Sequence, residues 1–66
     1  MEAKGILLEA KINGLGITRG QTYEVAEAED HGHFQVLWFY DDENKLSYHI
    51  YGGFSPADAF NVYYQI

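Results

Sequence analysis

Five short segments of the chain alternate apolar and polar residues with a period of two, a pattern typical of strands with one buried face. They are residues 5–12, 22–28, 33–40, 46–51 and 61–66. No window of eleven or more residues keeps a helical apolar period. The pattern therefore predicts an all-β protein.

Segment 33–40 differs from the others because both of its faces are apolar, which is typical of a central strand or of one with an exposed contact surface. Alternation alone does not say which face is buried. We assign to the core Ile6, Val25, Val36 and Ile50. For four residues on the opposite parity, a buried core position and an exposed binding position are equally expected: Leu37, Phe39, Tyr51 and Tyr63. His49 alternates with Tyr48 and Ile50 and is expected on the outer face of its strand.

The connections between the segments differ in kind. Residues 13–21 form a long glycine-rich excursion, whereas 29–32 and 41–45 are short and polar, as hairpin turns require. Ser55 and Pro56 supply a capping hydroxyl and a first-position proline, which predicts one short 3₁₀ turn near Ser55–Phe60. The expected fold is one domain over residues 1–66, a five-stranded, partly open barrel.

This order of elements resembles the SH3-like small barrel. The match lies in the run Leu15-Gly-Ile-Thr-Arg-Gly-Gln-Thr-Tyr-Glu-Val25 and in Gly53-Phe-Ser-Pro-Ala-Asp-Ala-Phe-Asn-Val62. By motif, Phe34, Pro56 and Phe60 correspond to the family's peptide groove, but the first strand carries no tyrosine pair, so a proline-rich ligand is not expected. The first run is closest to small bacterial and bacteriophage SH3-like proteins. That resemblance implies an inhibitor that binds a host protein in the host cytoplasm.

Composition narrows the class further. The 66 residues are 47% hydrophobic and 17% aromatic, which fits a single small folded domain. Without cysteine the chain has no disulfide or thiolate zinc site, and we expect a cytoplasmic protein. Neither a secretory signal nor a membrane-spanning run is expected. The net charge of −6 disfavours direct binding of nucleic acid and favours a protein partner with a basic surface.

Candidate chemistry is sparse. His31 and His33 flank a turn, and two histidines without a third fixed ligand make a poor metal site. The hydroxyl residues have no nucleophile motif around them. Glycines 14, 16 and 20 follow a strand but lead into no helix and carry no Gly-Lys-Ser/Thr ending, so a phosphate cradle is not indicated. We expect no enzyme activity, no cofactor and no metal.

With catalytic and metal-binding motifs not indicated, the remaining candidate for function is the exposed surface. Acidic residues gather before and after the aromatic third strand, and eleven aromatic residues exceed what so small a core hides. Rigid aromatic area with charge at its rim is typical of protein-binding surfaces. The candidate protein-binding residues are Glu24, Glu27, Glu29, Asp30, Phe34, Phe39, Asp41, Asp42, Glu43, Tyr51 and Tyr63.

The favoured function is a non-enzymatic acidic module that binds and blocks or modulates a protein. The expected target is a nucleic-acid-handling or defence protein, and the two acidic clusters would mimic a phosphate backbone. One alternative is self-association through the unprotected edge of strand 61–66. Another is a small-ligand or metal-binding module built from the glycine-rich loop and the histidines.

Overall fold

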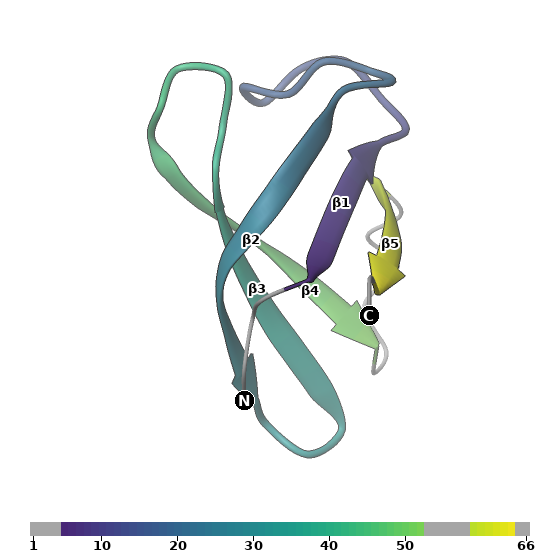
Figure 1. Ribbon diagram of the computed structural model, residues 1–66, viewed down its shortest axis with the longest axis vertical. Helices are drawn as coiled ribbons and strands as arrows, with labels where there is room; N and C mark the ends of the chain where they lie inside the picture. The colour runs from purple at the N-terminus through teal and green to yellow at the C-terminus, as the bar shows by residue number, and fades with distance from the viewer. Residues whose placement is uncertain (1–4, 53–58, 65–66) are drawn as a thin grey trace.

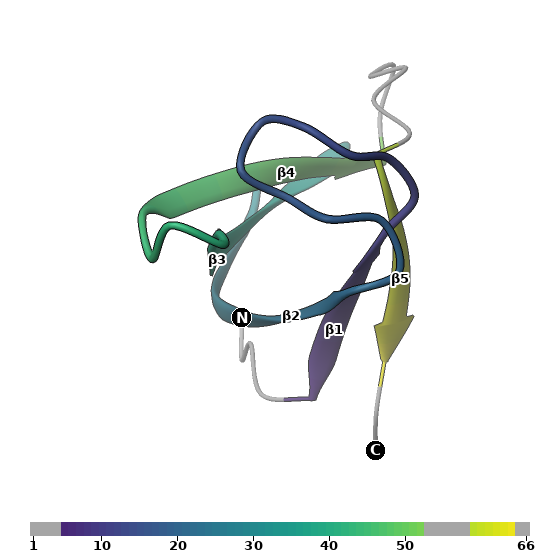
Figure 2. The ribbon, with the colours of Figure 1, turned by 90° about the horizontal axis from the view of Figure 1, so that it is seen from above.

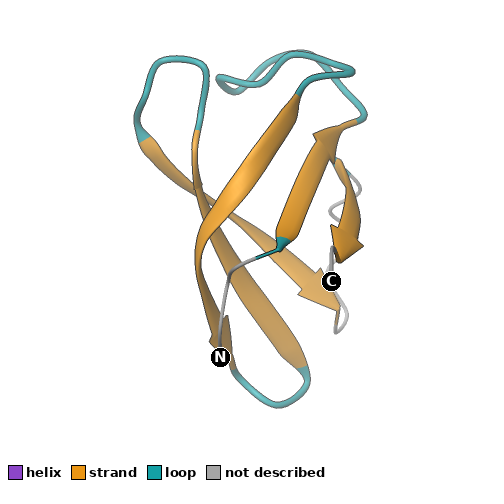
Figure 3. Ribbon diagram, viewed as in Figure 1, coloured by secondary structure: helices purple, strands orange, loops and turns teal. Residues whose placement is uncertain are grey.

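The computed structural model describes residues 5–52 and 59–64, and these form five antiparallel strands joined by loops (Figures 1 and 3). In chain order the strands are β1 (Ile6–Ala10), β2 (Thr22–Asp30), β3 (Phe34–Tyr40), β4 (Leu46–Gly52) and β5 (Phe60–Tyr64). The described residues include no helix, and so none that could cross a membrane. The all-β class and all five predicted strands are confirmed.

The strands make one sheet in the order β4-β3-β2-β1-β5, which leaves β4 and β5 at its edges. Seen from above, the sheet bends into a curve, with β4 at one end and β5 at the other (Figure 2). This curled half-barrel is consistent with the small SH3-like fold that the order of elements predicted. The predicted 3₁₀ turn near Ser55–Phe60 falls largely on residues 53–58, outside the described residues, as do residues 65 and 66.

A bulge in β2 sets which side chains face inward. Val25 is paired with Phe39, but Glu27 is paired with Trp38, so Ala26 is an extra residue between two successive pairs. The bulge lets both Val25 and Ala28 be buried while Glu27 stays exposed. The β2 face towards the core is therefore buried from Tyr23 to Ala28.

The core fills the inside of the curve. It is built by residues of β1, β2, β3 and β5, with Ile17 added from the first loop. Its buried members are Ile6, Leu8, Ala10, Ile17, Tyr23, Val25, Ala28, Leu37, Phe39 and Phe60. Ile12 continues the β1 alternation, but the strand ends at Ala10 and Ile12 is exposed.

The inward face of β3 and β4 corrects the sequence-based assignment. Leu37 and Phe39, for which a core and an exposed position were both expected, are buried in the core. Val36 and Ile50 are paired with each other on the outer face, where both are half-buried, so placing them in the core was wrong. His49, expected outside, is 6% exposed and meets the ring of Phe60 edge-on at 5.0 Å.

The first loop is tied to the β3–β4 turn. Asp42 donates its backbone N–H to the carbonyl of Gly16 at 2.8 Å. Its carboxylate accepts hydrogen bonds of 2.7 Å from the Thr18 hydroxyl and from the phenol of Tyr23. These contacts bring the two loops together at one end of the molecule, the upper end in Figure 1.

At the C-terminal end of β5, Tyr64 makes contacts across the open side of the curved sheet to residues of β3 and β4. The phenol of Tyr64 donates to the side-chain oxygen of Gln35 in β3 at 3.1 Å. The ring of Tyr51 lies 6.5 Å from that of Tyr64. Burial, together with the neighbouring Tyr51, raises the pKa of Tyr64, so this phenol stays neutral at physiological pH.

Candidate protein-binding face

The outer surface of β3 and β4 is apolar and aromatic. Because opposite residues of paired strands point to the same face, Trp38 lies beside Tyr48 and Tyr40 beside Leu46. Tyr40 is 53% exposed and Tyr48 60% exposed. We call this surface the aromatic face, and its members are Phe34, Val36, Trp38, Tyr40, Leu46, Tyr48 and Ile50.

The central pair of the aromatic face is in direct ring contact. The rings of Trp38 and Tyr48 are 5.4 Å apart and tilted by 54°. Trp and Tyr present large area while losing little conformational entropy, and both are enriched among the residues that dominate binding energy. The Trp38–Tyr48 pair, on β3 and the edge strand β4, therefore offers a rigid anchor for a partner.

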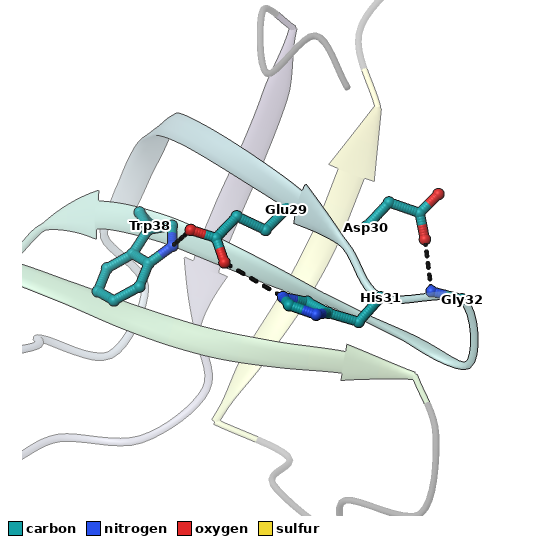
Figure 4. A network of polar contacts seen from close by, with 5 residues as sticks. All are labelled: Glu29, Asp30, His31, Gly32 and Trp38. Carbon is teal, nitrogen blue, oxygen red and sulfur yellow. Dashed lines mark hydrogen bonds and ion pairs between the residues drawn. The ribbon is translucent and has the colours of Figure 1, made fainter.

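Glu29 fixes the tryptophan and links it to the β2–β3 turn. The indole Nε1–H of Trp38 donates to Glu29 Oε2 at 3.1 Å, and Glu29 Oε1 lies 3.2 Å from His31 Nε2 (Figure 4). The His31 ring stacks on Phe34 at 5.0 Å with an interplanar angle of 12°. Asp30 points away from this group and accepts the backbone N–H of Gly32. Of the residues named from the sequence, Phe34 thus lies on the aromatic face and Glu29 adjoins it, whereas Asp30 caps the turn.

The formally charged side chains of the strands at the aromatic face are all acidic. Glu27 is opposite Trp38 in the register, is exposed, and makes no side-chain hydrogen bond or ion pair with another described residue. Strands β2, β3 and β4 together contain four acidic residues and neither lysine nor arginine. Glu24, one of the four, is also exposed and lies opposite Leu7 of β1, but it is not the partner of Trp38 in the register.

The second predicted acidic cluster has a structural task. Asp41 Oδ1 accepts the backbone N–H groups of Glu43 and Lys45, each at 2.9 Å, and Oδ2 accepts the Ser47 hydroxyl at 3.3 Å. These bonds, led by the one from Lys45, hold the pKa of Asp41 below its ordinary value of 3.8. Asp42 is bonded to the first loop, as described above. Of this cluster Glu43 alone leaves its carboxylate without a bond to another described residue.

Three other predicted residues lie away from the aromatic face. Phe39 is 2% exposed, so its assignment to a binding surface was wrong: it packs in the core against Tyr23 and Phe60. Tyr51 is exposed at the open side of the curve. Tyr63 is exposed on the outer surface of β5, and its phenol donates to Glu9, which raises the pKa of Tyr63.

An apolar groove of about 420 Å³ lies between the edge strand β4, the first loop and the start of β5, with core residues at its base. The exposed Leu15 lines it at a backbone φ of +56°, a conformation that leucine rarely adopts. Leu46, Tyr48 and Ile50 line both this groove and the aromatic face. The two surfaces are therefore continuous through β4.

The features that could hold a small ligand or a metal are weak. Within residues 5–52 and 59–64 no three His, Asp or Glu side chains are grouped as metal ligands. In the glycine-rich loop, Gly14 and Ile17 bond to each other, and Asn13 accepts the backbone N–H of Arg19. The loop thus uses much of its hydrogen-bonding capacity on itself.

Sequence reasoning missed Trp38, Tyr40 and Tyr48 as site residues, although a signal was present. The two faces of β3 differ in chemistry: Leu37 and Phe39 are wholly apolar, whereas Trp38 and Tyr40 each carry a polar atom. Aromatic residues with a polar atom favour half-exposed positions. That distinction places Trp38 and Tyr40 outside and the two wholly apolar side chains inside.

Comparison of the chain with family models, with curated proteins and with solved structures finds no match. The fold assignment therefore rests on the strand order and register, and any proposal of function rests on the chemistry of the surface.

Proposed function

We propose that the protein is a non-enzymatic binding module that docks a basic surface of a partner protein onto the aromatic face. The observation that carries the proposal is the contact of the half-buried Trp38 with the exposed Tyr48, with Glu27 and Glu29 beside them. Large exposed aromatic area rimmed by charge is the usual composition of an interface centre. Negative charge at the rim attracts and orients a positively charged partner.

The mode of action that fits such a module is steric. A partner surface that is covered by this face is closed to its other ligands, so the protein would inhibit or modulate its target. The resemblance to small phage SH3-like proteins supports a target of host origin, and the negative charge supports one that handles nucleic acid. On this proposal both proteins meet in the cytoplasm.

A matched pair of tyrosines tests the proposal. Tyr48→Ser removes an exposed tyrosine from β4 on the aromatic face, and Tyr63→Ser removes an exposed tyrosine from β5 on another surface. Both substitutions are at edge strands, so both variants should fold. Capture of the same protein by the unaltered chain and by Tyr63→Ser, with loss by Tyr48→Ser, is the expected result. Equal capture by all three chains, or loss only with Tyr63→Ser, would rule the aromatic face out.

Self-association is a second candidate, because β5 is an edge strand with exposed tyrosines. The net charge of −6 opposes it by repulsion between copies. Sedimentation equilibrium separates the two functions: the binding module is a monomer at all concentrations, and a self-associating protein gains mass with concentration.

A further inference from the structure

The surroundings of Trp38 are suited to one kind of side chain. Glu29 already accepts the indole N–H at 3.1 Å, which fixes the plane of the ring, and the half-buried side chain keeps part of its surface open to solvent. A cation over a tryptophan face is attracted by the ring quadrupole, and tryptophan is the best of the aromatic residues for this contact.

A carboxylate is available at the same place. Glu27 is opposite Trp38 on the neighbouring strand, and opposite residues have Cβ atoms about 5 Å apart. Glu27 is exposed and is not engaged by any residue in the described part of the chain. A cationic group resting on the indole is thus within reach of a free carboxylate. No lysine or arginine of β2, β3 or β4 competes for it.

We propose that the aromatic face receives an arginine side chain of the partner, with the guanidinium stacked on Trp38 and hydrogen-bonded to Glu27. Tyr48 flanks the site, its ring 5.4 Å from that of Trp38. Arginine fits better than lysine because a planar guanidinium stacks on an aromatic ring while its N–H groups still point outward to a carboxylate. This inference rests on the proposed function and names the chemistry of the partner's anchor.

The sole tryptophan makes the site directly observable, since the protein has a single indole N–H resonance. The probes are three peptides of equal length, acetyl-Gly-Xaa-Gly-Xaa-Gly-amide, in which Xaa is arginine, lysine or the uncharged citrulline. Titration of the ¹⁵N-labelled protein should shift the Trp38 indole resonance with the arginine peptide. The lysine peptide should bind at least about threefold more weakly, because an ammonium lacks the planar stacking and the forked N–H groups of a guanidinium. The citrulline peptide should produce no shift.

Two glutamates of β2 provide the matched variants. Glu27→Gln should weaken binding of the arginine peptide by about threefold or more, as expected when a charge-assisted bond to a guanidinium is lost. Glu24→Gln reduces the net negative charge equally but changes a residue that is not paired with Trp38, and it should leave the affinity unchanged. Equal loss in the two variants, or equal binding of all three peptides, would overturn the arginine site.

The two proposals fail separately. Peptides with no effect on Trp38, combined with partner capture that depends on Tyr48, would leave the aromatic face as the interface and remove the arginine anchor. An arginine-specific shift at Trp38, combined with capture indifferent to Tyr48, would retain the anchor site and remove the proposed docking face.

Discussion

The phenol of Tyr23, buried in β2, donates a hydrogen bond of 2.7 Å to Asp42 Oδ1 in the β3–β4 turn. The same phenol oxygen accepts the backbone N–H of Thr18 at 2.9 Å. One side chain therefore joins the core to the first loop and to a turn nineteen residues further along the chain. Burial and the adjoining Asp42 carboxylate raise the pKa of Tyr23, which keeps the phenol protonated as a donor.

Breaking this link should loosen the first loop. We expect Tyr23→Phe to lower the free energy of unfolding by about 1–2 kcal/mol, because the bond to Asp42 is lost and the N–H of Thr18 loses its acceptor. A double-mutant cycle with Asp42→Ala, measured by urea denaturation, should give a coupling energy of at least about 0.5 kcal/mol. Strict additivity would contradict the link.

Gly16 is expected to resist substitution more than Gly20. Both have a positive φ, +79° and +88°, so alanine strains the backbone at either position. At Gly16 an added Cβ would also lie 2.6 Å from Asp41 Oδ2, whereas at Gly20 it meets nothing within 4 Å. Thermal denaturation should therefore show Gly16→Ala to be about 1 kcal/mol or more below Gly20→Ala. Equal stabilities would mean that the loop does not approach the turn as described.

Asp41 should make stability depend on acid. Its pKa is lower in the folded protein than in the unfolded chain, so ionised Asp41 stabilises the fold above pH 3.8, and this contribution is lost as the pH falls through the lowered pKa. Asp41→Asn should be less stable than the unaltered chain at pH 7, and the gap should narrow below pH 3.8. Urea denaturation over this pH range is the measurement, and a gap independent of pH would refute the role of the carboxylate.

Alanine substitutions at two adjacent residues test which face of β3 points into the core. Leu37 is fully buried, and Leu37→Ala should cost about 2–5 kcal/mol of unfolding free energy. Val36 is half-buried on the outer face, and Val36→Ala should cost less than about 1 kcal/mol. The reverse order would restore the sequence-based assignment of Val36 to the core.

The sequence was sufficient for the strands and turns, because period-two alternation and glycine or aspartate turns are local signals. It was insufficient for the inward face of β3, since Val36 and Leu37 are equally apolar and neighbouring strands decide between them. The bulge at Ala26 depends on the register with β3, which no local pattern contains. His49 is polar, yet its ring packs against Phe60 from a distant strand.

The candidate site, like the fold, was predictable from the sequence only where the signal is local. The acidic residues flanking β3 were evident, but composition does not distinguish a free carboxylate such as Glu27 from one that caps a turn, such as Asp41. That difference arises from backbone N–H groups that only the folded turn brings to Asp41. Phe39 was placed on the wrong side because the parity of β3 was undetermined.

The most direct test of the aromatic face is a map of chemical-shift changes on the ¹⁵N-labelled protein when its captured partner is added. The account predicts changes centred on Trp38, Tyr40 and Tyr48, extending to Glu27, with the resonances of Tyr63 and its β5 neighbours unmoved. Changes centred on β5 or on the glycine-rich loop, with the Trp38 indole signal unaffected, would contradict it.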